Sequence, residues 1–277
     1  MAQSITLTAS MRSNLASLKS IQSQMDTTQE RLSTGKKVNS AIDNASSFYQ
    51  SRALTNRAAD LDSLLDSMGQ GIQTIQAANE GIEAITSYIE QAKSIANSAY
   101  ALDEAATGYD TQLEKYQEQF NAIIDEIETL AKDASYQGIN LLTGGDLTVM
   151  FNETRVHKLD IQGADVVTAM AEDDIGFTTA SWTGAEDVSD TLDSIAKAID
   201  YLRGYSAELG NNFSIIETRQ NFTAAMVDVL ETGADNLVLA DMNEESANYL
   251  ALQTRQQLAI NSLALASQSA QSVLSLF

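Results

Sequence analysis

The side chains that most often carry catalysis or bind metal are scarce in this sequence. Its 277 residues include one histidine, His157, and no cysteine. Zinc sites draw on Cys and His ligands, and protein nucleophiles need a neighbouring base. The sequence therefore lacks a full set of residues for a zinc site or for nucleophilic catalysis. Gly35 and Lys36 suggest a phosphate loop, but Glu30 and Lys37 stand where that motif requires Gly and Ser or Thr. We therefore predict that the chain is not an enzyme and uses no cofactor or metal.

Paired acidic residues are the remaining candidates for a cation site. Asp173–Asp174 and Glu244–Glu245 each place two carboxylates side by side. The chain has 38 acidic and 16 basic residues, a net charge of −22, so solvated surface acids are the expected interpretation of both pairs. Residues 58–231 contain 31 of the acids and eight of the bases. This acidic middle argues against nucleic-acid binding, which depends on neutralising phosphates.

Long helices are predicted to carry nearly all of these residues. Proline is absent, so no helix is broken by a missing backbone donor. Apolar residues at three- and four-residue steps predict a helix over 44–99, roughly 80 Å long at 1.5 Å per residue. Two more helices are expected: one over 113–130, opened by a capping box at Thr111 and Glu114, and one over 188–231, ended at Gly233.

One segment breaks the helical pattern. Apolar and polar residues alternate over 147–151 and 159–161, and glycines flank both runs. Alternation with period two is typical of strands, so we predict a small β-hairpin. The stretch 164–187 is acidic and is expected to be irregular.

The two ends of the chain are weakly charged and suited to helices. Between 248 and 277 the only charged residue is Arg255. Both ends repeat apolar residues in heptads, with Leu15, Gln22 and Gln29 expected at the alternate position of the first helix. Neither helix has enough apolar surface to be stable alone, so we predict that they pair and contact other copies of the chain. The residues predicted to make this packing are Met11, Leu15, Leu18, Met25, Leu32, Ile260, Leu263, Leu274, Leu276 and Phe277.

A short turn follows the first helix. Gly35 is a natural left-handed helix end, and Ser40 with Asp43 three residues later forms a capping box for the next helix. The fold class predicted from these elements is mainly α: an elongated antiparallel helical coiled-coil bundle with paired N- and C-terminal helices and a small β-hairpin segment.

Residues 30–45, ERLSTGKKVNSAIDNA, and residues 259–267 and 271–277 at the other end of the chain are similar to the N- and C-terminal patterns of the bacterial flagellin family. Residues 137–142, QGINLL, resemble the turn that closes its third helix. One departure is Asp43-Asn44, where many relatives carry two acids.

The resemblance implies a structural subunit that polymerises into the flagellar filament for swimming motility. Residues 1–43 plus 233–277 would form the inner core, folding on assembly and lining a central channel. Residues 44–143 plus 177–232 would form a surrounding coiled-coil layer. Residues 144–176 would be a small β-hairpin and surface-exposed segment. Flagellins usually insert variable outer domains where this chain has only 144–186, so the chain resembles a minimal form.

The resemblance also implies a location and partners. The chain would be exported by the flagellar secretion apparatus without a cleaved signal peptide, with an export chaperone, a filament cap and hook-junction proteins as partners. No run of 18 apolar residues predicts a membrane span. Gln91 and Ser94 stand where charged residues are expected for recognition by an innate immune receptor, so weak or absent recognition is expected.

Two alternatives stay open at this point. The hook–filament junction protein shares these end patterns, but its relatives commonly carry proline after the acids near residue 44, and this chain has none. A flagellin-like surface adhesin or ligand-binding module, acting through residues 144–186, is the other alternative.

Overall fold

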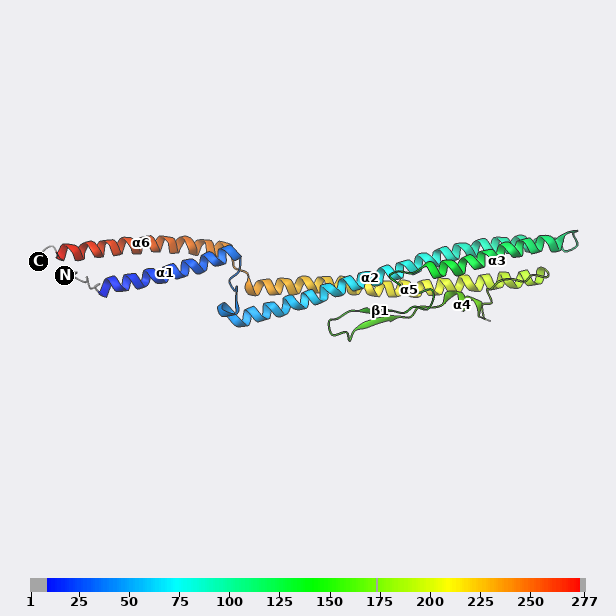
Figure 1. Ribbon diagram of the computed structural model, residues 1–277, viewed down its shortest axis with the longest axis horizontal. Coiled ribbons are helices and arrows are strands. Elements are labelled where there is room, and N and C mark those ends of the chain that lie inside the picture. The colour runs from blue at the N-terminus through cyan, green and yellow to red at the C-terminus, as the bar shows by residue number, and fades with distance from the viewer. Residues whose placement is uncertain (1–8, 173, 275–277) are drawn as a thin grey trace. The chain divides into compact units, whose positions relative to one another are not determined.

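The computed structural model describes residues 9–172 and 174–274, which form six helices and two strands. In chain order these are α1 (Ala9–Thr34), α2 (Ala41–Tyr100), α3 (Tyr109–Asp133), β1 (Leu147–Met150), β2 (Lys158–Ile161), α4 (Val166–Ala171), α5 (Ala185–Val238) and α6 (Met242–Leu274), as labelled in Figure 1. The predicted class, mainly helical with one small hairpin, is confirmed. The chain divides into two compact units: a terminal unit, up to residue 58 and from 228 onward, and a central unit, 59–227.

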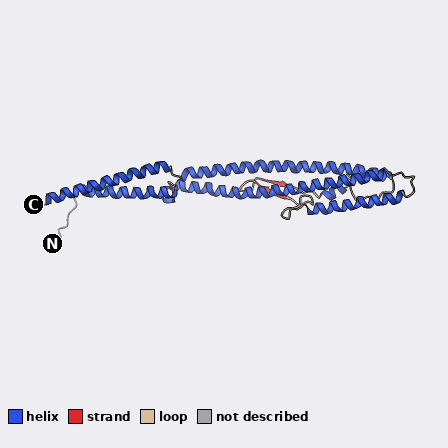
Figure 2. Ribbon diagram, turned by 90° about the horizontal axis from the view of Figure 1, so that it is seen from above, coloured by secondary structure: helices blue, strands red, loops and turns tan. Residues whose placement is uncertain are grey.

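The core of the central unit lies between three long helices. Helices α2, α3 and α5 run side by side in both views (Figures 1 and 2). Each turns a stripe of apolar residues inward at three- or four-residue steps, which is how an amphipathic helix buries one face. The largest fully buried side chains of these helices are Met68, Ile85, Ile89, Phe120, Ile127, Ile195, Leu202, Leu209 and Ile216.

The hairpin packs against α2. Strands β1 and β2 are antiparallel, with Leu147 opposite Ile161 and Val149 opposite Leu159. Val149 is buried, and its Cγ2 lies 2.8 Å from the point where a Cβ on Gly71 would stand. A glycine inside α2 is therefore required for this close approach.

The turn after α3 is held by one amide side chain. Asn140 donates through Nδ2 to the carbonyl of Ala131 at 2.8 Å and accepts through Oδ1 from the Leu142 N–H at 2.8 Å. Leu141 and Leu142 are fully buried, and the Tyr205 hydroxyl of α5 donates to the Leu141 carbonyl. The 137–142 segment thus fastens α3 to α2 and α5.

Three expectations about element boundaries are wrong. Helix α3 begins at Tyr109, after Gly108 with φ of 94°, so Thr111 and Glu114 lie inside the helix and form no cap. Helix α5 continues through Gly233 to Val238, and a Cβ on Gly233 would make only an ordinary contact, 3.6 Å from Leu54 Cδ1 of α2. The stretch expected to be irregular contains α4, whose start Asp165 caps by accepting from the Thr168 N–H.

Candidate functional site

The terminal unit is built on the pairing of α1 with α6. The two helices lie side by side in Figures 1 and 2. On α1, Met11 and Met25 are buried and Leu18 and Leu32 are half-buried. The alternate position of this seam was predicted wrongly: Leu15, Gln22 and Gln29 are exposed. The residues at that position are Asn14, Ile21 and Thr28.

Most polar residues of α1 are small, so more than one face of this helix can pack against a partner. The sequence alone therefore does not determine which face of α1 packs against α6. Gln22 still touches α6, because its Oε1 accepts from Gln256 Nε2 at 2.7 Å. The contact lies beside the seam rather than within it. The second position of the seam therefore lies three residues after Met11, Leu18 and Met25, one residue earlier than predicted, while these three residues pack as expected.

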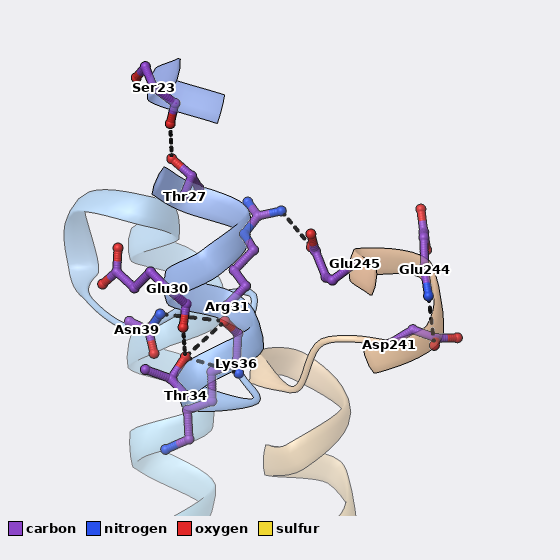
Figure 3. A network of polar contacts seen from close by, with 10 residues as sticks. All are labelled: Ser23, Thr27, Glu30, Arg31, Thr34, Lys36, Asn39, Asp241, Glu244 and Glu245. Carbon is purple, nitrogen blue, oxygen red and sulfur yellow. Dashed lines mark hydrogen bonds and ion pairs between the residues drawn. The ribbon is translucent and has the colours of Figure 1, made fainter. Parts of the chain in front are cut away.

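An ion pair joins α1 to α6 (Figure 3). Arg31 Nη1 lies 2.9 Å from Glu245 Oε1, and the Glu245 residue is only 8% exposed. A carboxylate that is largely removed from water needs such a partner, because an unpaired buried charge is strongly unfavourable. Glu245, interpreted from the sequence as a solvated acid, is instead a largely buried partner of Arg31 across the two terminal helices. Nothing in the local sequence indicates a partner 214 positions away.

Backbone hydrogen bonds fix the chain where it leaves α1 and enters α6. Gly35 has φ of 71°, and its N–H donates to the Arg31 carbonyl at 2.8 Å. The Lys37 N–H donates to the Val238 carbonyl, and the Ala240 N–H donates to the Gly35 carbonyl. These bonds tie together two segments that are more than 200 residues apart in sequence. Asp241 Oδ1 then accepts from the Glu244 N–H at the start of α6 (Figure 3).

The start of α2 depends on Asp43. Its Oδ2 accepts from the Asn39 and Ser40 backbone N–H groups at 3.0 and 2.9 Å and from the Ser40 hydroxyl. These bonds from the Ser40 and Asn39 N–H groups hold the pKa of the Asp43 carboxyl below its usual value. Asn44 has non-helical φ and ψ of −159° and 98°, and its Oδ1 accepts from the Ser47 N–H. A single short turn thus precedes the long run of α2.

Large apolar side chains remain exposed on both helices of the pair. On α6, Leu258 and Leu265 are 62% and 70% exposed, and Leu250 and Ile260 are also exposed. On α1, Leu15 is exposed. Leu258 and Leu265, seven residues apart, share one face of α6, and exposed apolar surface of this kind is typical of a site that binds another protein. This arrangement offers a packing surface and no catalytic group.

The comparisons with known proteins identify the family. Residues 5–146 match the model of the bacterial flagellin N-terminal helical region, and residues 192–277 match the bacterial flagellin C-terminal helical region. The chain belongs to the bacterial flagellin family. It is therefore a structural subunit of the extracellular bacterial flagellar filament, as predicted from its sequence, and not an enzyme. The junction and adhesin alternatives are not favoured.

Individual flagellins match over nearly their full length. The chain is 30% identical to flagellin FljK of Caulobacter vibrioides, over 99% of this chain and 98% of that protein. It is 30% identical to a flagellin of Brucella melitensis, over 99% of each. The alignment with flagellin A of Rhizobium meliloti, at 25% identity, extends over 402 positions, so that flagellin is longer than this 277-residue chain. The short form predicted for this flagellin is confirmed.

The other residues singled out from the sequence come from separate elements: the hairpin turn, the segment after α4, and α6. His157 is exposed at the hairpin turn, and Asp174 and Glu244 are exposed. Among the residues that the structure describes, no group of three acids or histidines is placed to hold a metal ion, and no helix is long and apolar enough to span a membrane. Leu263 is half-buried on α6, and Leu274 is the last residue of α6. Asp173, Leu276 and Phe277 lie outside the described residues.

Proposed function

We propose that this flagellin polymerises through its terminal helices, which complete their folding only when subunits join. The observation that carries the proposal is the narrow α1–α6 seam, which leaves Leu258 and Leu265 largely exposed. Each buried CH₂ contributes about 0.8 kcal/mol, so covering these leucines in a neighbouring subunit supplies stability that the isolated pair lacks. Folding and assembly are then coupled.

The proposal assigns three layers to the subunit. Residues 1–43 and 233–277 form the inner core and line a channel, residues 44–143 and 177–232 form a coiled-coil layer around it, and residues 144–176 face outward. Met11, Leu15, Leu18, Met25, Leu32, Ile260, Leu263, Leu274, Leu276 and Phe277 are proposed as the packing residues, and Gly35, Ser40 and Asp43 as the turn that orients the helices.

Further partners are proposed from membership of the family. They are an export chaperone, a filament cap and hook-junction proteins, with export through the flagellar secretion apparatus without a cleaved signal peptide. Gln91 and Ser94 are exposed on α2. Because neither is charged, we expect weak or no recognition by an innate immune receptor that requires charged groups at these positions.

The test compares full-length variants in the extension of filament seeds, followed by sedimentation and electron microscopy. Leu258→Lys places a charge on the exposed apolar face and should abolish extension while leaving the helix content of the monomer unchanged. Gln257→Lys, at the neighbouring exposed position of α6, is the matched control and should extend seeds. Normal filaments from Leu258→Lys would show that this face makes no subunit contact.

A shortened chain tests the same proposal for the terminal helices as a whole rather than for one residue. Residues 44–232 without the terminal helices should remain monomeric beside good seeds, whereas the intact chain grows long filaments. If the intact chain stays monomeric or forms only short rings, assembly through these helices is wrong.

A further inference from the structure

A polar cavity of about 420 Å³ lies between α1 and α6 in the terminal unit. The ion pair between Arg31 and Glu245 forms part of its wall (Figure 3). Both helices line it with side chains that can donate hydrogen bonds. These side chains include Ser23, Thr28, Arg31, Asn248 and Arg255.

The charge of this cavity is opposite in sign to that of the whole chain, which is −22. The ionisable residues that line the cavity are Arg31, Arg255 and Glu245. Arg31 is already paired with Glu245 at 2.9 Å. Within the described part of the chain, no acidic group pairs with Arg255, the only charged residue between 248 and 277. The cavity therefore contains one uncompensated positive charge.

A buried hydroxyl on α1 belongs to the same cavity. Thr28 is only 6% exposed and lines the cavity. The neighbouring Thr27 donates its hydroxyl to the Ser23 carbonyl, the usual arrangement in a helix, but no described group forms a hydrogen bond with the hydroxyl of Thr28. Buried polar groups normally have a partner. A water molecule satisfies such a hydroxyl but leaves the charge of Arg255 uncompensated.

A small oxyanion satisfies both groups. The guanidinium of Arg255 can donate two parallel hydrogen bonds to a carboxylate or a phosphate group. The Thr28 hydroxyl and the side chains of Ser23 and Asn248 can donate to further oxygen atoms. Because the donors come from two helices, a tetrahedral anion with four oxygens makes fuller use of them than a planar carboxylate with two.

Other classes of ligand fit this cavity less well. The positive charge of Arg255 repels a metal cation. An apolar molecule would leave the Thr28 hydroxyl buried without a partner. Nucleic acid needs several cationic groups for its phosphates, and it is repelled by a chain with a net charge of −22. A small anion carries too little charge for that repulsion to dominate.

We propose that the cavity between α1 and α6 binds a small tetrahedral oxyanion, such as inorganic phosphate, through Arg255 and Thr28. The two residues lie on different helices, so the complete site exists only while α1 and α6 are paired. A ligand that binds only the paired state stabilises that state by mass action. The inference concerns a single subunit and requires no polymer.

Titration calorimetry of the monomeric full-length chain with inorganic phosphate tests the site, with NaCl adjusted to keep the ionic strength constant. We expect saturable binding by the wild type. Arg255→Gln and Thr28→Val, which is similar in shape, should each raise the Kd at least tenfold. Arg12→Gln removes a charge from an exposed position of α1 outside the cavity and should bind as wild type does. No saturable binding by the wild type, or the same Kd in Arg255→Gln and Arg12→Gln, would overturn the proposal.

Hydrogen exchange locates the effect of the bound ion. Leu252 is buried on α6 and lines the cavity. At a phosphate concentration of about nine times the Kd, exchange of its amide should slow about tenfold, whereas Ile85 in the central unit should not change. No slowing at Leu252 contradicts the proposal. If Thr28→Val loses helix content, Arg255→Gln decides, because Arg255 is exposed. Failure of the wild type to extend seeds would remove the proposed function and leave these measurements unaffected.

Discussion

At the scale of single residues, Asp43 shows how one carboxylate can organise a turn. It accepts hydrogen bonds from two backbone N–H groups, of Asn39 and Ser40, and from the Ser40 hydroxyl. Those N–H groups lie between two helices, where no ladder of backbone bonds satisfies them. The carboxylate replaces the missing acceptors, and its charged form is favoured by the same bonds. The geometry of the turn is therefore linked to the ionisation of Asp43.

This link gives a pH dependence with a definite sign. The pKa of Asp43 is lowered from the usual 3.8, so its stabilising effect is present above about pH 3.8 and is lost as the pH falls through the lower folded value. We expect the protection of the Ser40 amide against hydrogen exchange to be constant from pH 7 to 4 and to decline below that range. Asp43→Asn should reduce this protection severalfold at pH 6.

Asp60→Asn, an exposed position on the same helix, is the matched control and should leave the Ser40 amide unchanged. Equal protection of Ser40 in Asp43→Asn and wild type would show that the carboxylate does not hold the turn.

At the scale of elements, two glycines inside α2 distinguish helix propensity from tight packing, which have opposite effects when glycine is replaced by alanine. An alanine gains up to about 1 kcal/mol over glycine in a helix interior. A Cβ on Gly81 would stand 2.7 Å from Leu142 Cδ1 and 2.8 Å from Ala134 Cβ, whereas a Cβ on Gly69 would meet only Gln220 Nε2, at 3.7 Å. The same substitution should therefore have opposite effects at the two positions.

We expect Gly69→Ala to raise the free energy of unfolding by about 0.5–1 kcal/mol. Gly81→Ala should lower it by about 1 kcal/mol, because overpacking a tight contact typically costs 1–3 kcal/mol and outweighs the helix gain. Urea denaturation of the monomeric full-length chain measures both. A stabilising effect at Gly81 would mean that the 137–142 segment can move away from α2 without loss.

The elements also show which parts of the fold the sequence can predict. The long helices and the hairpin were predictable because their apolar periods, near 3.6 and 2, are sustained over many residues. The residues at the second seam position of α1 were not predictable, because Asn14 and Leu15 are both compatible with the heptad and only packing against α6 decides between them. Helix α4 was missed since six residues are too few to show a period, although Asp165 was a visible cap.

The candidate site divides in the same way. The weak charge and the heptads of the two chain ends predict that these ends pack together. The pairing of Glu245 with Arg31 could not be predicted, because no local pattern connects residues that far apart. The exposure of Ile215 and Phe222 on α5 was not predictable for a related reason: α5 carries apolar residues on more than one side, and periodicity alone cannot tell the buried side from the exposed one.

At the scale of the whole molecule, charge and apolar contact are separated along the chain. Residues 58–231 contain 31 of the 38 acidic residues, whereas residues 248–277 contain one charged residue, Arg255. Repulsion between subunits therefore arises mainly from the middle of the sequence, and attraction is assigned to the uncharged faces. Salt weakens the repulsion between charges and leaves the attraction between apolar surfaces nearly unchanged, since apolar burial is not an interaction between charges.

Raising the salt concentration should therefore promote polymerisation. The Debye length falls from about 30 Å at 0.01 M to about 8 Å at 0.15 M, so copies of a chain with a net charge of −22 repel each other less. We expect the critical concentration for seed extension to fall severalfold over this range, measured by sedimentation with NaCl as the only variable. Sucrose at matched osmolality should produce a smaller change, because it does not screen charge. A critical concentration that rises with NaCl would mean that ion pairs between subunits, rather than the exposed apolar residues of the terminal helices, dominate the contact.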